Sequence, residues 1–315
     1  MENPNVRIMS TSRGPVEYLD SGNGEVILSL HGAMGGYDQS QILARTIGEE
    51  NYRYLSLSRP GYLGTPLIAG ETPEEQADLY AEVIDLLGIR QVIVFAISGG
   101  GPSAINFALR HRDRCRGLVL VSTMGGKTRN KIPFFFHVMT RMAKWPAFVD
   151  MMREKTEKNL KQNLRRSISN PAILERTVRD TDVMALYTEL TVGIFNRMAE
   201  RIEGTKNDIK ISQTTTYSLK DIAVPTLVIH GTKDLLVPFE EHGMRLATEI
   251  PGAQLLAAEG GEHVTIFTHR EEIRSKVAAF LKGLNGEEET SKKDYNNAID
   301  NTVIQAYICS NPRGE

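Results

Sequence analysis

The chain has 315 residues, and the usual prior of about 150 residues per domain suggests two domains. With 41% hydrophobic and 24% charged residues, 27 glycines and 13 prolines, the composition is that of a globular protein and excludes a collagen-like or disulfide-stapled chain. The 37 Lys and Arg residues against 39 Asp and Glu residues give a formal charge of −2, so no overall positive field is available to bind nucleic acid or an anionic membrane.

Short apolar runs that end in turn residues predict the strands of a buried sheet. They span residues 26–30, 52–57, 91–97, 117–122 and 226–230. Each run is hydrophobic almost throughout, which is typical of a parallel sheet covered by helices on both faces. The predicted fold class is therefore α/β.

Helix signals lie between these runs. Thr72, Pro73 and Glu75 have the spacing of a capping box with a proline in the first turn. Apolar residues then recur at helical spacing up to Gly88, which ends the predicted helix. A second helix is expected over residues 100–111, directly after the third strand.

The strand pattern is interrupted between residues 123 and 221 by a stretch with helical spacing, in which Pro146 is expected to separate two helices. This interruption predicts an inserted helical domain. The expected organisation is a core of residues 1–122 and 222–284, a helical cap of residues 123–221, and a disordered tail of residues 285–315.

Part of the insert is strongly basic. Residues 127–170 carry eleven Lys and Arg against three Asp and Glu, an excess of eight positive charges in a chain whose total is −2. A solvated helical surface is the simpler interpretation, and a site for an anionic partner or an acidic substrate is the alternative.

The sequence around Ser98 predicts a nucleophile elbow. Residues 95–104 read FAISGGGPSA and lie directly after a predicted strand and directly before a predicted helix. A serine on so sharp a turn needs small neighbours two positions away on either side, and Ala96 and Gly100 satisfy this requirement. The amide of Gly99 would then point from the start of the helix toward a developing oxyanion.

With these residues in place, the chain resembles the α/β-hydrolase fold family, in its serine hydrolase branch with a helical cap. The similarity covers about residues 16–284. Besides the elbow it rests on HGAMGG at 31–36, SRPGYLGT at 58–65, PTLVIHGTKD at 225–234 and GGEH at 260–263. The resemblance implies a mostly parallel central sheet with helices on both faces and an inserted helical cap.

The resemblance also implies a site. It makes the amide of Ala33 the second oxyanion donor, and Asp234 and His263 the partners of Ser98 in a catalytic triad. In these roles His263 would accept the proton of the Ser98 hydroxyl and return it to the leaving group, and Asp234 would fix the imidazole tautomer. Each residue alone has a simpler interpretation, Asp234 for example as a helix N-cap, but the order Ser98, Asp234, His263, each at a strand end, favours the triad.

Neither a cofactor nor a metal is expected. The sequence contains no HExxH spacing, and residues 99–101 lack the third glycine of a dinucleotide-binding motif. The segment Gly126-Lys127-Thr128 lacks the first glycine of a phosphate loop, because residue 121 is valine.

The residues proposed to line a substrate pocket are apolar. Met34, Phe135, Met139 and Met142 could form an adaptable apolar surface for a substrate. The alternative is that the cap's apolar residues form the cap's own core.

The first functional hypothesis is a carboxylesterase-like serine hydrolase that cleaves a small or medium apolar ester through an acyl-enzyme on Ser98. A serine at the elbow argues against the dehalogenases and epoxide hydrolases of the family, which place aspartate there. Two alternatives stay open: a carbon–carbon hydrolase of a dienoic diketo acid, of the meta-cleavage product type, whose carboxylate the basic cap would anchor, and a ligand-binding protein of the same fold without turnover.

The expected partner is a small-molecule substrate, with no nucleic acid. No apolar run approaches the ~18 residues of a membrane span, so no integral membrane segment is expected. Cys115 and Cys309 form no CxxC pair, and the N-terminus lacks a signal-peptide pattern, which together favour a cytoplasmic location. The sequence does not predict an oligomeric state.

Overall fold

The computed structural model describes residues 5–128, 138 and 140–286. The chain divides into two units, residues 1–277 and 278–315. In the second unit residues 278–286 are described, and they are helical. The rest of the predicted tail lies outside the described residues, and everything below concerns the first unit.

The first unit contains one sheet with the strand order β1-β2-β4-β3-β5-β6-β7-β8. The strands are β1 (Val6–Thr11), β2 (Gly14–Ser21), β3 (Glu25–Leu30), β4 (Tyr52–Leu57), β5 (Val92–Ile97), β6 (Cys115–Val121), β7 (Thr226–Gly231) and β8 (Gln254–Ala258). The pairs β1·β2 and β2·β4 are antiparallel, and all pairs from β4 to β8 are parallel. The prediction of a mostly parallel α/β sheet is confirmed.

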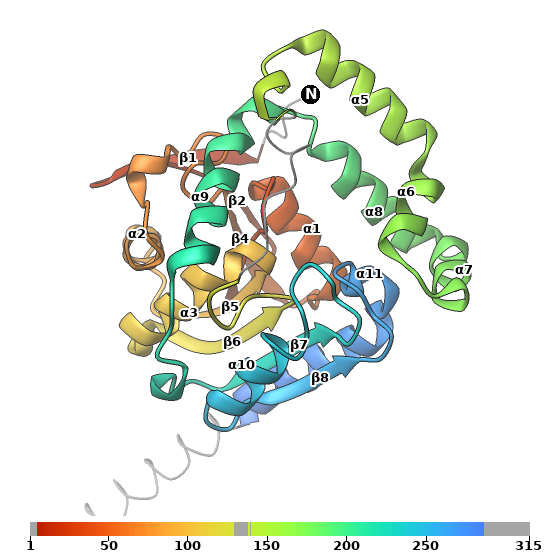
Figure 1. Ribbon diagram of the computed structural model, residues 1–315. Helices are drawn as coiled ribbons and strands as arrows, with labels where there is room; N and C mark the ends of the chain where they lie inside the picture. Colours follow the sequence, from red (N-terminus) through yellow and green to blue (C-terminus); the bar gives the residue numbers. More distant parts are fainter. Residues whose placement is uncertain (1–4, 129–137, 139, 287–315) are drawn as a thin grey trace, which may run out of the picture. The chain divides into compact units, whose positions relative to one another are not determined.

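Helices cover both faces of this sheet (Figure 1). Among the longer ones are α1 (Tyr37–Ile47), α2 (Pro73–Leu86), α3 (Gly101–Arg110), α5 (Pro146–Lys158), α6 (Leu160–Ser167), α7 (Pro171–Arg179), α8 (Thr181–Gly193) and α9 (Ile202–Thr214), and residues 270–277 are helical as well. Shorter ones are α10 (Gly243–Glu249) and α11 (Thr265–Thr268). The capping box predicted for α2 is present, with the Thr72 side chain accepting from the Glu75 amide.

The alternation of side chains along each strand builds the core. Leu28, Val94 and Leu120 share one apolar cluster with residues of α2, α3 and α10. Ile27 and Ile93, one residue earlier on their strands, are also fully buried, so both faces of the central strands are covered. This double burial is the physical reason for the continuous apolar runs in the sequence.

Three strands have no counterpart among the predicted ones. β1 and β8 lie at the two edges of the sheet, and both have exposed positions along their length. β2 contains Gly14, Pro15, Glu17 and Asp20. β1 and β2 are not continuous apolar runs, so the signal that identified the central strands is missing there, and β8 has only the short run Leu255 to Ala258, half of it alanine.

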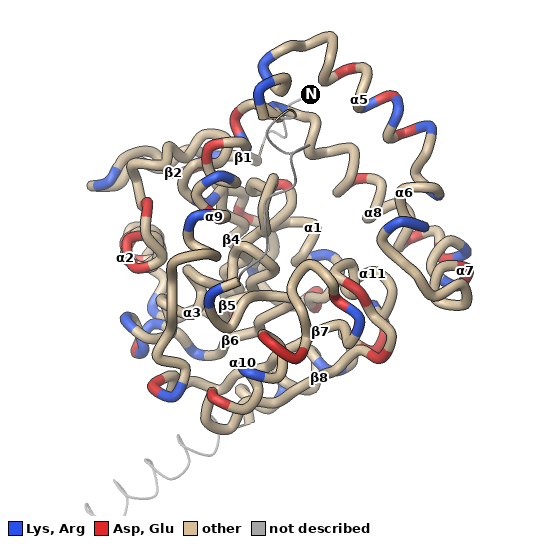
Figure 2. Tube along the Cα trace, in the orientation of Figure 1, with Lys and Arg blue, Asp and Glu red and all other residues tan. Residues whose placement is uncertain are grey.

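The described residues between β6 and β7 form helices and the turns and loops that connect them, with no strand among them. A helical turn reaches residue 142, and α5 begins at Pro146, so the expected separation at this proline is observed. Figure 2 shows basic residues along α5 to α7. None of the helices among the described residues combines the length and the apolar character needed to cross a bilayer.

Candidate active site at the end of strand β5

Ser98 directly follows β5 and opens the short helical turn Ser98–Gly100 that leads into α3. Its φ is +50°, in the left-handed region that is uncommon for residues other than glycine and that marks a strained elbow. A Cβ atom at Gly100 would lie only 2.7 Å from the His31 carbonyl oxygen, so this position has no room for a side chain. The local geometry is therefore that of the predicted strand, turn and helix.

The three residues of the predicted triad meet in one chain of contacts. His263 Nε2 lies 3.1 Å from Ser98 Oγ, and His263 Nδ1 lies 2.9 Å from Asp234 Oδ2. The second carboxylate oxygen, Asp234 Oδ1, accepts hydrogen bonds of 2.9 Å from the amides of Leu236 and Val237. One oxygen of Asp234 thus binds the histidine while the other fixes the loop after β7.

This loop also bears on the simpler interpretation of Asp234 as a helix N-cap. The next helix, α10, begins only at Gly243, nine residues further along the chain. Asp234 Oδ1 closes a tight turn with the next amides instead of capping a helix.

The pKa of Asp234 is consistent with its hydrogen bond to His263. Burial alone would raise the pKa of Asp234, but the hydrogen bond and the charge of His263 outweigh burial and hold this pKa below its usual value. Asp234 is therefore ionised at neutral pH and accepts the Nδ1 proton of His263. The Nε2 lone pair is then free to accept from Ser98.

Ala33 lies in the loop that follows strand β3. A Cβ atom at Gly32 would lie 3.1 Å from Ser98 Cβ, so the loop passes directly beside the nucleophile. The Ala33 nitrogen lies 3.3 Å from the position that a Cβ of Gly99 would occupy. The structure thus brings the two predicted oxyanion donors together beside Ser98, and neither amide donates to another group among the described residues.

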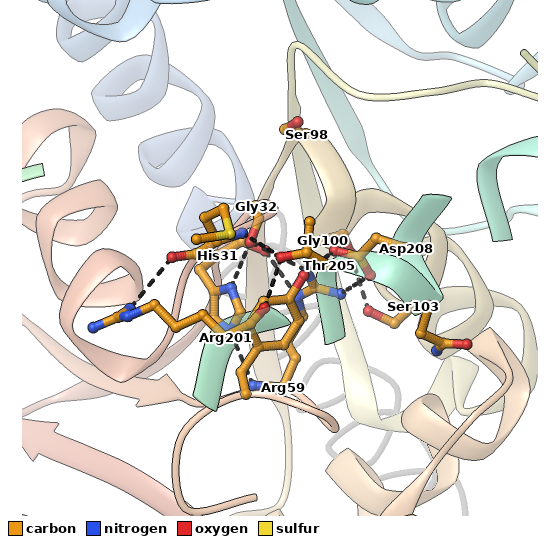
Figure 3. A network of polar contacts seen from close by, with 12 residues as sticks. His31, Gly32, Arg59, Ser98, Gly100, Ser103, Arg201, Thr205 and Asp208 are labelled. Atoms are coloured by element: carbon orange, nitrogen blue, oxygen red, sulfur yellow. Dashed lines mark hydrogen bonds and ion pairs between the residues drawn. The ribbon is translucent and has the colours of Figure 1, made fainter. Parts of the chain in front are cut away.

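A buried ion pair that the sequence did not suggest lies under this loop (Figure 3). Arg59 binds Asp208 of α9 through both terminal nitrogens, Nη1 to Oδ1 at 2.9 Å and Nη2 to Oδ2 at 2.5 Å. Tyr62 also donates to Asp208 Oδ2 at 2.5 Å. Burial lowers the pKa of Arg59, but Asp208 and Tyr62 outweigh it, so the guanidinium stays charged. No spacing pattern could reveal a pair separated by 149 residues.

His31 at the end of β3 is a neutral, fully buried imidazole. Burial and the nearby Arg59 charge hold the pKa of His31 well below its usual value. Its Nε2 accepts from the Arg59 amide at 3.0 Å, so Nδ1 carries the proton and donates to the Gly32 carbonyl oxygen at 2.7 Å.

Two of the four predicted pocket residues lie among the described residues. Met34 is half-buried and packs against an apolar cluster that contains Phe195 and Met198. Met142 is half-buried as well. Phe135 and Met139 lie outside the described residues, so the substrate pocket stays a prediction. No group of three or more His, Cys, Asp or Glu side chains in the described part of the chain has the arrangement of a metal site.

Three buried histidines predict a pH dependence of stability. His31, His230 and His242 are at most 1% exposed, and burial is the main cause that lowers the pKa of each. Below about pH 6.5 the unfolded chain therefore binds protons that the folded chain does not, and each such group can remove up to about 1.4 kcal/mol of stability per pH unit. Urea unfolding at pH 7.5, 6.5 and 5.5 should show the free energy of unfolding falling as the pH is lowered.

The variant His242→Leu tests the cause, because neither ring nitrogen of His242 has a hydrogen-bond partner among the described residues. Its stability should depend less steeply on pH than that of the wild type. An equally steep slope would contradict the assignment.

Comparison with known proteins identifies a family. The family model of the α/β hydrolase fold matches residues 25–270 of this chain. The 2-hydroxy-6-oxononadienedioate/2-hydroxy-6-oxononatrienedioate hydrolases of Burkholderia vietnamiensis and Klebsiella pneumoniae are similar. The first is 28% identical over 85% of this chain and 91% of its own length, and the second is 29% identical over 83% and 89%.

Among solved structures, an α/β hydrolase fold protein from Nakamurella multipartita is similar with a TM-score of 0.75 and 31% identity, over 88% of this chain and 98% of its own. The family match covers most of the chain, and the sheet and the elbow have the geometry that the match requires. The chain therefore belongs to the α/β hydrolase fold family.

Proposed function

We propose that this protein is a hydrolase whose nucleophile is Ser98, with His263 as general base and acid and Asp234 as the carboxylate that orients it. Its proposed reaction is the cleavage of a carbon–carbon bond beside a ketone in a dienoic dicarboxylic acid. The observation that most supports a hydrolase with Ser98 as nucleophile is the unbroken chain of contacts from Asp234 Oδ2 through His263 to Ser98 Oγ, at 2.9 and 3.1 Å.

The proposed steps follow from these contacts. Ser98 Oγ attacks the ketone carbon while His263 Nε2 accepts the hydroxyl proton, and the carbonyl electron pair moves onto oxygen. The amides of Ala33 and Gly99 donate to this oxyanion. When the oxyanion collapses, the carbon–carbon bond breaks, its electron pair moves into the leaving group to form a conjugated enolate, and this enolate takes the proton from His263. Water, activated by the same histidine, then releases the acyl group from Ser98.

The choice of bond depends on the leaving group. A carbanion leaves only if its charge is delocalised. In the 2-hydroxy-dienoic form the carbon beside the ketone is vinylic and gives no delocalisation, so the dienol first tautomerises: its hydroxyl loses a proton and the carbon beside the ketone gains one. In the resulting 2-keto form the leaving group is a conjugated enolate. The relatives from Burkholderia vietnamiensis and Klebsiella pneumoniae are named for a substrate of this kind, a dienedioate with a keto group at carbon 6. These names favour the carbon–carbon reaction over the ester cleavage that was the first hypothesis from the sequence.

The charge of the insert is consistent with a substrate that carries two carboxylates. Residues 127–170 have an excess of eight positive charges, and Arg165 and Arg166 at the end of α6 are exposed. Exposed positive charge raises the local concentration of an anionic substrate and its association rate, an effect that salt screens.

A substrate panel tests the proposal. The purified protein is assayed with 2-hydroxy-6-oxononadienedioate and with p-nitrophenyl butyrate. We expect kcat/KM for the dienedioate to be higher by about 10²-fold or more, because only that substrate combines the delocalised leaving group with the two carboxylates. A higher kcat/KM for the ester would instead favour the carboxylesterase hypothesis.

Turnover of neither substrate, together with no labelling of Ser98 by a fluorophosphonate, would favour a ligand-binding protein without catalysis. Labelling without turnover would instead leave the serine assignment intact and place the error in the choice of substrate.

A further inference from the structure

The two amides proposed as oxyanion donors belong to peptide groups whose carbonyl oxygens are held by buried side chains. The Ala33 amide shares its peptide group with the Gly32 carbonyl, and the Gly99 amide shares its peptide group with the Ser98 carbonyl. In a planar trans peptide the N–H and C=O bonds point in opposite directions. A hydrogen bond that fixes the carbonyl therefore fixes the direction of the amide.

The Gly32 carbonyl is held from two sides. His31 Nδ1 donates to it at 2.7 Å, and Arg59 Nη2 donates to it at 3.3 Å. Arg59 also donates from Nε to the His31 carbonyl oxygen at 2.8 Å. The position of this guanidinium is set in turn by the two hydrogen bonds it makes to Asp208.

The Ser98 carbonyl is held in the same way. Thr123 Oγ1 donates to it at 2.5 Å, and the Gly101 amide donates to it as well. Thr123 is fully buried just after β6. A side chain at Gly101 would overlap Thr123 Oγ1, so the glycine leaves the space through which the hydroxyl reaches the elbow.

Helix α9 holds the next peptide of the loop too. Thr205 Oγ1 accepts from the Met34 amide at 2.9 Å and donates to the Arg201 carbonyl oxygen at 2.7 Å. Asp208, one turn further along α9, approaches the elbow so closely that a Cβ at Gly99 would lie 2.6 Å from its Oδ2. Figure 3 shows Thr205 and Asp208 with the loop glycine Gly32.

We propose that Asp208 and Thr123 are positioning residues of the oxyanion hole. Asp208 acts through Arg59 on the Gly32–Ala33 peptide, and Thr123 acts directly on the Ser98–Gly99 peptide. Each bond aims an amide at the oxyanion, and a donor on the carbonyl oxygen also polarises the peptide and strengthens its N–H as a donor. The proposal rests on the proposed function, because it assigns these two amides to the oxyanion.

The test uses one near-isosteric variant for each peptide. Thr123→Val removes the hydroxyl at nearly constant volume, and Asp208→Asn removes the charge that holds Arg59. Loss of one oxyanion donor costs about 10²–10³ in kcat, so misaligning one should lower kcat by about 10- to 100-fold. KM should change much less, because the bound substrate carries no oxyanion before Ser98 attacks it. Thr123→Ser, which keeps the hydroxyl, should restore most of kcat.

Two further readouts separate positioning from general damage. Affinity for a trifluoromethyl ketone, which forms an oxyanion on Ser98, should fall in parallel with kcat, whereas affinity for the reaction product should not. Asp20→Asn is the matched control, because Asp20 also binds an arginine through both oxygens, Arg53 at 2.9 and 2.7 Å, on the sheet between β2 and β4. This control should keep the wild-type kcat.

The outcomes are distinct for the two proposals. If fluorophosphonate does not label Ser98 in the wild type, the proposed function fails. If it labels the wild type and folded Thr123→Val or Asp208→Asn retains kcat within twofold, or loses activity only in KM, the positioning proposal is overturned. Circular dichroism checks folding, and should Asp208→Asn unfold because Arg59 loses its counter-charge, Thr123→Val alone decides.

Discussion

Replacing Ser98 with alanine is expected to lower kcat on the order of 10⁶-fold, because the triad acts as a unit and nothing else at the elbow supplies a nucleophile. The change removes one oxygen atom, whose contact is the 3.1 Å hydrogen bond to His263. Alanine has a Cβ like serine, so the strain of the positive φ at this position is the same before and after the substitution. The variant should therefore fold with nearly wild-type stability.

The measurement combines turnover of the dienedioate, fluorophosphonate labelling and thermal unfolding. Ser103→Ala is the matched control, since Ser103 is a buried serine of α3 that binds Tyr80 and the Gly100 carbonyl and does not contact the histidine. It should lose some stability and keep its turnover. A wild-type rate in Ser98→Ala would remove Ser98 from the mechanism.

Replacing Asp234 with asparagine is expected to lower kcat by about 10⁴-fold. Asparagine can still present its carbonyl oxygen to the amides of Leu236 and Val237, so the turn after β7 is preserved. Its NH₂ group then faces His263 Nδ1 and requires a lone pair there, which moves the imidazole proton to Nε2. A protonated Nε2 cannot accept the proton of Ser98, so the loss is in chemistry and not in folding.

Asp234→Ala separates the two functions of this side chain, because it removes the oxygen that accepts from the buried amide of Val237. It should lose activity as Asp234→Asn does and in addition unfold more easily, by about 1–3 kcal/mol for an unpaired buried group. Steady-state kinetics and urea unfolding of both variants measure the two effects. Equal stability of the two variants would mean that the turn does not depend on this carboxylate.

How much the sequence could predict depends on where each element lies. The central strands are buried on both faces, so their apolar runs identify them. At the edges β1 carries no such run, and β8 has only four apolar residues, two of them alanines. The elbow was visible because the steric demand for small residues around Ser98 is local. The loops of Asp234 and His263 were found through their likeness to a family, since their spacing along the chain has no meaning before the sheet aligns them.

The residues that hold the peptides of the site could not be predicted either, because the folded chain alone brings them together. Arg59 and Asp208 come from a loop after β4 and from α9, and Thr123 lies two residues beyond the end of β6 with no motif around it. The bond to be cleaved was not determined by the triad either, because ester and carbon–carbon hydrolysis require the same three side chains. The relatives, not the residues, shifted the preference toward the carbon–carbon bond.

Because α9 is bonded to the loop after β3 and to Arg59, the substrate specificity of this protein could be altered without changing that loop. α9 belongs by chain order to the inserted segment, yet Thr205 and Asp208 hold it to the loop after β3 and to Arg59. The helices before it, α5 to α8, have no such bond to the oxyanion loop among the described residues. Evolution or a protein engineer could therefore exchange α5 to α8 as a module with a junction before Met198, and the hydrogen bonds that α9 makes to the proposed oxyanion loop and to Arg59 would be retained.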